Sequence, residues 1–300
     1  MHQLADNITA PPADPSMALI RQLVTEFIIF PLGSALVKER APYNVRSALF
    51  YGMPGSGKTM VVRAIAYETN AMVFDLSPNT TTEVYQGRKE EDRMIAATML
   101  VAKEYQPSLI YIDEVEKVYP AKKKKGKKGK KKKKNDPTNP ARIKKSLAKW
   151  RAKFIDDKTR ICIIGCTSAP DDGSKVEFKK NFDKAIYFPH PDYTTCRLLW
   201  KTFIEEKLQP ENARGPRVRL RPDFPLSTLA HISYGYSAGS LQTAVEKVLT
   251  KERRKNVDNR PLNISEFIGP LSLTSTSLDT DWESFTVRFL MTYFRNSLVT

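Results

Sequence analysis

The stretch GMPGSGKT, residues 52–59, decides how the rest of this sequence is interpreted. It fits the pattern G-x-x-x-x-G-K-[ST] of a phosphate-binding loop, in which glycines let backbone N–H groups point at an anion. Lys58 is expected to reach the β- and γ-phosphates of a nucleotide, and the Thr59 hydroxyl is expected to bind Mg²⁺. The residues that we expect to contact the nucleotide are Pro54, Gly55, Ser56, Gly57, Lys58, Thr59 and Met60.

The segments on either side of this loop provide the context that the motif requires. Residues 47–51 (SALFY) form an apolar run that is typical of a buried strand, and residues 60–66 are apolar and compatible with a helix. The alternative is a glycine-rich turn that happens to carry a lysine. The order of strand, loop and helix favours the nucleotide-binding interpretation.

A second strand pattern ends in two carboxylates. Residues 108–112 (SLIYI) run directly into Asp113 and Glu114. Ligands of open α/β sheets bind at the carboxyl ends of the strands, so both acids are expected beside the nucleotide. We expect Asp113 to complete the Mg²⁺ shell and Glu114 to polarise the attacking water. Two solvated acids after a buried strand are the alternative.

Strand patterns alternate with helical patterns up to about residue 190, and only helical patterns follow. Further strands are expected at residues 71–76, 160–166 and 185–188, and residues 31–42 are expected to link the first helix to the phosphate loop. Residues 237–252 are expected to form one helix. This alternation predicts an α/β fold with a parallel five-stranded sheet, helices on both faces and a small all-helical second domain. The expected parts are residues 1–30 (arm and helix), 31–190 (nucleotide-binding domain), 191–270 (helical domain) and 271–300 (linker and helix).

The composition is basic, but the charge is concentrated in one place. The chain has 300 residues and a formal net charge of +16. Eleven of the thirteen residues 122–134 are lysine, and removing them would lower the net charge from +16 to +5. The cysteines and histidines form no metal-binding pattern. No apolar run approaches the ~20 residues that span a bilayer, so a membrane protein is not expected.

The lysine-rich insertion at residues 121–139 has two interpretations. One is a solvated, disordered insertion, and the other is an electrostatic tether to a polyanion. No aromatic residue lies between Lys122 and Asn139, so stacking on nucleobases is not supported. Nucleic acid is therefore the less favoured polyanion.

The order of these motifs resembles that of AAA-type ATPase modules. The phosphate loop, the Asp113 strand end, a strand that ends at Ser168 and the stretch GYSAGSL at residues 235–241 occur in the AAA order. The resemblance covers residues 31–270 and implies that the helical domain is a lid. It implies that Ser168 stands at the first sensor, where asparagine is usual, and that Ala238 lies in the second sensor beside the nucleotide. It also implies bound ATP or ADP with Mg²⁺.

Other stretches resemble the IQ and AAA domain-containing proteins, a family that includes dynein regulatory complex subunit 11 of cilia and flagella. The stretches are residues 20–24 (IRQLV), 45–47 (VRS), 74–78 (FDLSP) and 191–193 (PDY). The resemblance implies a component of the nexin–dynein linker on axonemal doublet microtubules. Its implied partners are other subunits of the dynein regulatory complex and, through Lys122–Lys134, acidic tubulin tails. An IQ motif is not found, so the sequence corresponds to the AAA half of such a protein or to a shorter relative.

One stretch departs from the pattern of active AAA rings. Their usual G-R-F-D-R stretch supplies arginines to the γ-phosphate of a neighbouring subunit, and the matching residues here are 180–184 (KNFDK). Asn181 carries no charge, and Lys184 lacks the planar guanidinium fork. Because an arginine finger is worth about 10³–10⁵ in rate, we expect a structural nucleotide-binding module with slow or absent turnover.

Two other functions remain as alternatives. The first is an active ring-forming ATPase that remodels or severs a protein or microtubule substrate, for which Tyr85 would be a pore-loop aromatic. The second is a nucleic-acid ATPase or clamp loader, which rests on charge alone and ranks last.

Overall fold

The computed structural model describes residues 14–274, except residues 42, 83, 86, 122–138, 210–219 and 258. The predicted lysine-rich insertion and the predicted terminal helix therefore lie outside the described residues. Two compact units are present. The first comprises the described residues up to Gly52 and those from Lys58 to Phe188. The second comprises Met53–Gly57 and the described residues from Pro189 onward.

A parallel sheet forms the centre of the first unit and confirms the predicted fold class. Its strands lie in the order β2-β3-β4-β1-β5, so β1 is flanked by β4 and β5. All five predicted strands are present, with ends that differ from the prediction by at most one residue. The strands are β1 (Ser47–Gly52), β2 (Met72–Asp75), β3 (Ser108–Ile112), β4 (Ile161–Thr167) and β5 (Lys184–Phe188).

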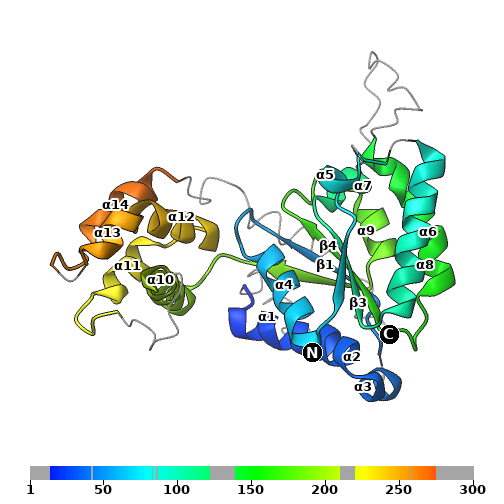
Figure 1. Cartoon of the computed structure of the whole chain (residues 1–300), viewed down its shortest axis with the longest axis horizontal. Helices are drawn as coiled ribbons and strands as arrows, with labels where there is room; N and C mark the ends of the chain where they lie inside the picture. Colours follow the sequence, from blue (N-terminus) through cyan, green and yellow to red (C-terminus); the bar gives the residue numbers. More distant parts are fainter. Residues whose placement is uncertain are drawn as a thin grey trace, which may run out of the picture. The chain divides into compact units, whose positions relative to one another are not determined.

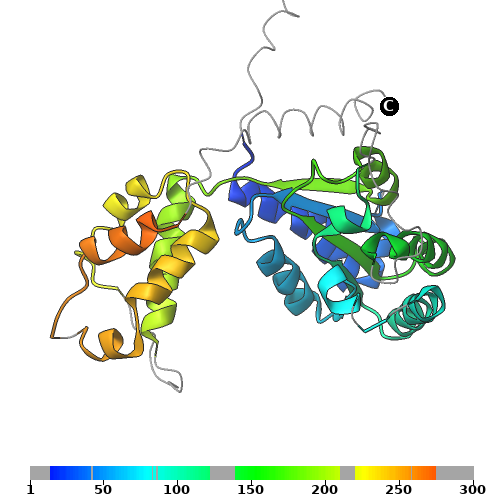
Figure 2. The ribbon, with the colours of Figure 1, turned by 90° about the horizontal axis from the view of Figure 1, so that it is seen from above.

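Different helices cover the two faces of this sheet. Ala48 and Phe50 of β1 belong to the core on one face, because alternate side chains of a strand point the same way. Figure 1 shows α4 on one side of the strands and α6 and α8 on the other, and Figure 2 shows the same sheet from above. The helices of the first face are α1 (Met17–Val24), the π-helical turn η1 (Thr25–Ile29), α2 (Phe30–Gly33) and α4 (Lys58–Thr69). Helix α6 (Arg88–Glu104) contacts β2 and β3, and α8 (Ile143–Phe154) packs against α6.

The segment that links the first helix to β1 is itself partly helical. It contains α2 and α3 (Ala35–Arg40), and the Ser34 hydroxyl accepts a hydrogen bond from the Val37 N–H at the start of α3. Such a cap satisfies one of the free N–H groups of a helix start. The other helices of the first unit are α5 (Pro78–Thr81), α7 (Val115–Val118), the 3₁₀ turn η2 (Pro140–Arg142) and α9 (Lys175–Asn181).

The described part of the second unit is helical and packs around Trp200. The Trp200 and Phe267 rings meet edge to face at 5.5 Å, and the buried Trp200 indole N–H donates to the Ser233 hydroxyl at 2.8 Å. Residues 237–252 were expected to form one helix, but α12 ends at Val248 and Thr250 caps a new helix. The helices are α10 (Tyr193–Leu208), α11 (Leu226–Ile232), α12 (Ala238–Val248), α13 (Lys251–Lys255) and α14 (Ser265–Ser272). Within the described residues, no helix has both the length and the apolar composition needed to cross a membrane.

Candidate nucleotide-binding site

The carboxyl ends of three adjacent strands bring most of the predicted residues of the first unit together. Tyr51 of β1 pairs with Thr167 of β4, and Ile112 of β3 pairs with Gly165 of β4. The three strands therefore end at the same edge of the sheet. Gly52, the start of the phosphate loop, is the last residue of β1. The pair of acidic residues, Asp113 and Glu114, directly follows β3, and the predicted first-sensor residue, Ser168, directly follows β4.

The start of the phosphate loop requires glycine for a steric reason. Gly52 has a φ of +151°, and a Cβ atom at this position would lie 2.2 Å from the backbone oxygen of Phe188 in β5. Gly52 therefore allows β1 and β5 to lie close together where the chain leaves the sheet.

Lys58 is buried at the start of α4, with a side chain that is 6% exposed. Its ammonium group donates a hydrogen bond to the Gly52 carbonyl oxygen at 3.0 Å. Burial lowers the pKa of Lys58 to about 8, against the opposing effects of Cys166, Asp113 and Glu116. A partly desolvated ammonium group at this place suits an anionic ligand, because phosphate oxygens would favour its charged form.

The middle of the phosphate loop, Met53–Gly57, belongs to the second compact unit. The Gly239 N–H donates to the Gly55 carbonyl oxygen at 2.9 Å, and a Cβ atom on Gly55 would lie 2.7 Å from the Ser237 hydroxyl oxygen. Ser237 caps α12, whose first residue is Ala238, the predicted second-sensor residue. Gly57 has a φ of +96°, and a Cβ atom added to it would meet no other atom within 4 Å, so its backbone is open to a ligand.

The remaining loop residues differ in what they contact. The Thr59 hydroxyl lies 3.3 Å from the Tyr111 hydroxyl, whereas the Met60 side chain is 63% exposed. Pro54 is exposed and Ser56 is buried. Tyr111 is a neighbour of the predicted Mg²⁺ ligand that the sequence did not reveal.

Asp75, the last residue of β2, and Ser77, which follows the strand, hold the Asp113 backbone in place. The Asp113 N–H donates to the Ser77 hydroxyl oxygen at 2.9 Å, and the Ser77 hydroxyl donates to the Asp75 carboxylate at 2.5 Å. Thr59 and Asp113 offer a hydroxyl and a carboxylate, which are oxygen donors of the kind that Mg²⁺ prefers. Asp75 and Ser77 were missed as site residues because they lie far from the acidic pair in the sequence.

Glu114 has a left-handed backbone conformation, with φ +46° and ψ +46°. Such angles are uncommon for residues other than glycine, asparagine and aspartate, and they cluster at functional sites. The Glu114 carboxylate pairs with the Lys117 ammonium group at 2.7 Å. Lys117 follows Glu114 by three residues at the start of a helix, and this spacing could have predicted their ion pair from the sequence.

A third carboxylate lies near the two predicted acids. Burial raises the pKa of Glu116 above its usual value, although a hydrogen bond from Thr167 opposes the shift. Thr167 is the last residue of β4 and is fully buried, and the half-buried Ser168 follows it. Glu116 was not among the predicted site residues, and its charge adds to that of Asp113 and Glu114 at this edge.

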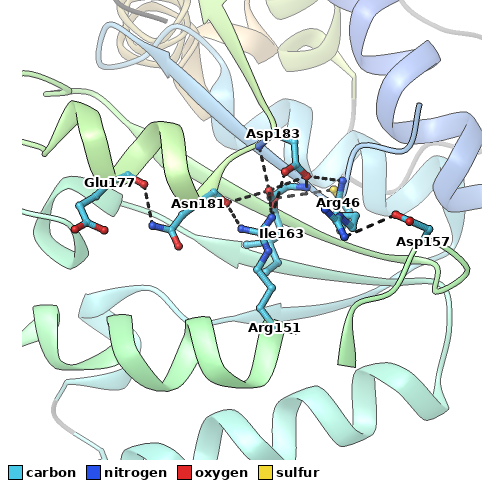
Figure 3. Close-up of polar contacts among 9 residues, drawn as sticks. Arg46, Arg151, Asp157, Ile163, Glu177, Asn181 and Asp183 are labelled. Carbon is cyan, nitrogen blue, oxygen red and sulfur yellow. Dashed lines mark hydrogen bonds and ion pairs between the residues drawn. The ribbon is translucent and has the colours of Figure 1, made fainter. Parts of the chain in front are cut away.

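The residue at the predicted first arginine-finger position, Asn181, makes its contacts inside its own chain. The Asn181 side-chain amide donates to the Glu177 carbonyl oxygen at 2.8 Å (Figure 3). Its backbone oxygen accepts hydrogen bonds from the Ser47 hydroxyl at 3.0 Å and from the Arg151 guanidinium group. Asn181 therefore completes the end of α9 and the start of β1.

The residue at the predicted second arginine-finger position, Lys184, lies over two aromatic rings. The Lys184 ammonium group is 5.0 Å from the centre of the Phe27 ring and 5.3 Å from that of Tyr43. Both distances are within the range of cation–π attraction. Lys184 thus ties the start of β5 to the N-terminal helical segment.

The predicted pore-loop aromatic, Tyr85, is held by a residue that follows the lysine-rich insertion in the sequence. The Arg142 guanidinium group donates to the Tyr85 backbone oxygen and lies 3.7 Å from the carboxylate of Glu91, which is 1% exposed. The Tyr85 side chain is 39% exposed. The structure places Tyr85 beside Arg142, a relationship that the sequence did not predict.

Comparison with protein families defines the class of protein. Residues 48–190 match the family "ATPase family associated with various cellular activities (AAA)". The match contains β2 to β5, all of β1 except its first residue, and the phosphate loop. The chain therefore carries an AAA domain, and nucleotide binding is a general property of that class.

Comparison with individual proteins finds similarity to dynein regulatory complex protein 11 and to spastin. The chain is 32% identical over 276 residues to dynein regulatory complex protein 11 of Mus musculus, a match that covers 90% of this chain and 30% of that protein. It is 28% identical over 294 residues to spastin of Bos taurus, covering 93% of this chain and 44% of that one. The chain is thus an AAA module similar to that of dynein regulatory complex protein 11, and it spans less than half of these relatives.

Solved structures support the fold. The AAA domain of FIGL-1 in complex with ADP matches with a TM-score of 0.67 and 17% identity, covering 95% of this chain and 92% of that one. At this level of identity the likeness concerns the fold alone.

Proposed function

We propose that this chain is the nucleotide-binding AAA module of a structural or regulatory component of the dynein regulatory complex, in the axoneme of cilia or flagella. It binds ATP or ADP with Mg²⁺ and hydrolyses ATP slowly or not at all. The observation that carries the second statement is that Asn181 and Lys184 both make contacts within their own chain. The similarity to dynein regulatory complex protein 11 supports the first.

The residues of the phosphate loop fit a bound nucleotide. The open backbone at Gly57, the start of α4 and the buried ammonium group of Lys58 offer donors and positive charge to phosphate oxygens. Thr59 and Asp113 would hold Mg²⁺, which would offset the negative charge of the phosphates. Bound nucleotide would raise the stability of the folded chain by mass action.

Slow turnover follows from what the chain lacks at the positions of the donating arginines. Glu114 is present to orient water, but the stabilisation of the transition state by a neighbour needs a planar, charged donor. Lys184 is not such a donor, and Asn181 is neutral. Ser168, shorter than asparagine, weakens the positioning of water at the first sensor.

The alternative function is an active oligomeric AAA ATPase that remodels a protein or microtubule substrate. The intact phosphate loop, the Asp113–Glu114 pair and the similarity to spastin favour it. The two functions differ in assembly. A stable ring formed by the Glu114→Gln variant with ATP would favour the remodelling ATPase.

The partners that we propose are other subunits of the dynein regulatory complex and the doublet microtubule, whose acidic tubulin tails suit Lys122–Lys134. Replacing these lysines with serine should weaken microtubule binding in a salt-dependent way. Equal binding of both forms across a salt series would contradict the tether. Localisation of the tagged chain in a ciliated cell tests the axonemal assignment.

A single-turnover assay of ATP hydrolysis tests the central proposal. We expect a rate well below ~1 s⁻¹, the low end for enzymes generally. The Glu114→Gln variant is the matched control, because phosphate release that persists in it comes from a contaminant. A rate above ~1 s⁻¹ that depends on protein concentration and disappears in Glu114→Gln would overturn the proposal.

A further inference from the structure

Three exposed lysines lie around one pair of stacked aromatic rings on the first unit. Trp150 and Phe154 of α8 stack with centres 5.7 Å apart and an angle of 25° between the rings. The Lys149 and Lys153 ammonium groups lie 4.6 Å and 5.2 Å from the centre of the Trp150 ring. Lys103, near the end of α6, lies 5.7 Å from the centre of the Phe154 ring.

This arrangement restricts the lysines more than ordinary surface lysines are restricted. The Trp150 indole N–H donates to the Asp92 carboxylate of α6 at 2.9 Å, which fixes the ring between the two helices. Cation–π attraction already holds the ammonium groups near the ring. The lysine side chains therefore lose less conformational entropy when they bind an anion. Asp92 is 3.4 Å from Lys149 and offsets part of the charge.

We propose that Lys103, Lys149 and Lys153, here named the lysine–tryptophan cluster, bind a glutamate-rich peptide segment of a partner protein. The cluster lies on α6 and α8. The proposal goes beyond the nucleotide role and does not depend on Lys122–Lys134.

The spacing of the cluster suits an extended acidic peptide. Lys149 and Lys153 are four residues apart on α8, a rise of about 6 Å. Side chains on one side of an extended peptide repeat at about 6.6–6.8 Å. Two carboxylates at alternate positions of the peptide can therefore face the two lysines, and a further carboxylate can reach Lys103.

The aromatic rings favour a peptide over a nucleic acid. Proteins that bind single strands without sequence preference stack bases on exposed aromatic faces. Here the Trp150 ring already contacts Phe154, Lys149 and Lys153 within its own chain. The cluster therefore offers charge and no stacking platform.

Binding of a fluorescein-labelled oligoglutamate peptide, followed by anisotropy, tests this surface. The starting protein is the full chain in which the lysines of residues 122–134 are serine, so that the insertion cannot mask the cluster. Adding Lys103→Gln, Lys149→Gln and Lys153→Gln together should weaken binding about tenfold and make its salt dependence shallower. The three side chains are exposed, so the circular dichroism spectrum and melting temperature should stay the same.

The matched control removes the same charge elsewhere. The control variant combines three substitutions at exposed lysines of the second unit, Lys247→Gln, Lys251→Gln and Lys255→Gln. It should change the affinity for the peptide less than about twofold. An equal loss in both triple variants would mean attraction by net charge and would overturn the proposal. A single-stranded oligonucleotide that binds more tightly than the peptide, and is lost only in the cluster variant, would overturn it too.

Discussion

Asp183 and Ser47 are joined by reciprocal backbone and side-chain hydrogen bonds. The Asp183 N–H donates to the Ser47 carbonyl oxygen at 3.0 Å, and the Asp183 carboxylate accepts from the Ser47 N–H at 3.0 Å. The same carboxylate accepts from the Arg46 N–H at 2.9 Å and lies 3.3 Å from the Arg151 guanidinium group. One half-buried side chain thus connects the starts of β1 and β5 with α8.

The first prediction concerns this carboxylate. Asp183→Asn should lower the free energy of unfolding by about 2–3 kcal/mol, because it removes the charge that pairs with a half-buried arginine. Urea denaturation measures the change. Asp157→Asn is the control, because the Asp157 side chain is 74% exposed and its ion pair with Arg46 is long, at 3.7 Å. Its effect on the free energy of unfolding should stay below about 0.5 kcal/mol. Equal effects of both substitutions would contradict the role of Asp183.

The second prediction concerns the close approach of β1 and β5. Gly52→Ala should lower the free energy of unfolding by at least about 2 kcal/mol more than Gly87→Ala does. It should also weaken binding of a fluorescent ADP analogue about tenfold. Both glycines have positive φ angles, but a Cβ atom on Gly52 meets the Phe188 backbone whereas that on Gly87 meets no atom within 4 Å. The difference between the two variants isolates the steric clash. Equal melting temperatures would refute it.

The third prediction concerns the contact between Arg142 and Tyr85. Arg142→Gln should speed amide hydrogen exchange of Val84 and Tyr85 about tenfold, because the hydrogen bond to the Tyr85 backbone is lost. Lys144→Gln serves as the control, since Lys144 pairs with Glu177 of α9 instead. Unchanged exchange in Arg142→Gln would show that other contacts hold this segment.

The fourth prediction concerns pH and the second unit. The Arg253 guanidinium group donates to both carboxylate oxygens of Glu266 at 2.8 Å and 3.0 Å and holds the pKa of Glu266 below its usual 4.5. A lowered pKa means that this pair stabilises the fold above pH 4.5 and that the stabilisation is lost as pH falls through the folded-state pKa. At pH 7, Glu266→Gln should lower the free energy of unfolding by about 1 kcal/mol.

The pH dependence of this cost provides the check. The difference in melting temperature between the wild-type chain and Glu266→Gln should shrink as the pH falls below 4.5, where Glu266 takes up a proton. Glu252→Gln is the control, because Glu252 is an exposed residue of the neighbouring helix α13 and should have little effect at any pH. A difference that grows toward acidic pH would have the wrong sign.

Local sequence patterns were sufficient to predict the sheet and the phosphate loop. Buried parallel strands such as residues 108–112 are continuous apolar runs, and the loop motif depends on glycines at fixed spacing. The helices at residues 31–42 were missed because Phe30, Pro31 and Gly33 lie inside a short helical turn whose stability comes from packing. The break after Val248 was missed because the cap formed by Thr250 interrupts a continuous helical pattern.

The contacts around the candidate site were harder to predict, because they join residues that are distant in sequence. The hydrogen bond between Asp113 and Ser77 spans 36 residues, and that between Arg142 and Tyr85 spans 57. Lys184 and Phe27 meet only after β5 and the N-terminal helices have packed together. The residue types at positions 181 and 184 could be read from the sequence, but their internal partners could not.

The contacts of Asn181 and Lys184 give any assembly of this module a direction. If the proposed function holds, a copy would accept a guanidinium group from an unlike neighbour, since its sequence carries the phosphate-loop motif and the Asp113–Glu114 pair. It has none to offer in return, because one position is neutral and the other is turned onto Phe27 and Tyr43. In a mixed ring, the neighbour that needs an arginine from this copy would receive none and would hydrolyse ATP slowly. The neighbour on the other side would be unaffected.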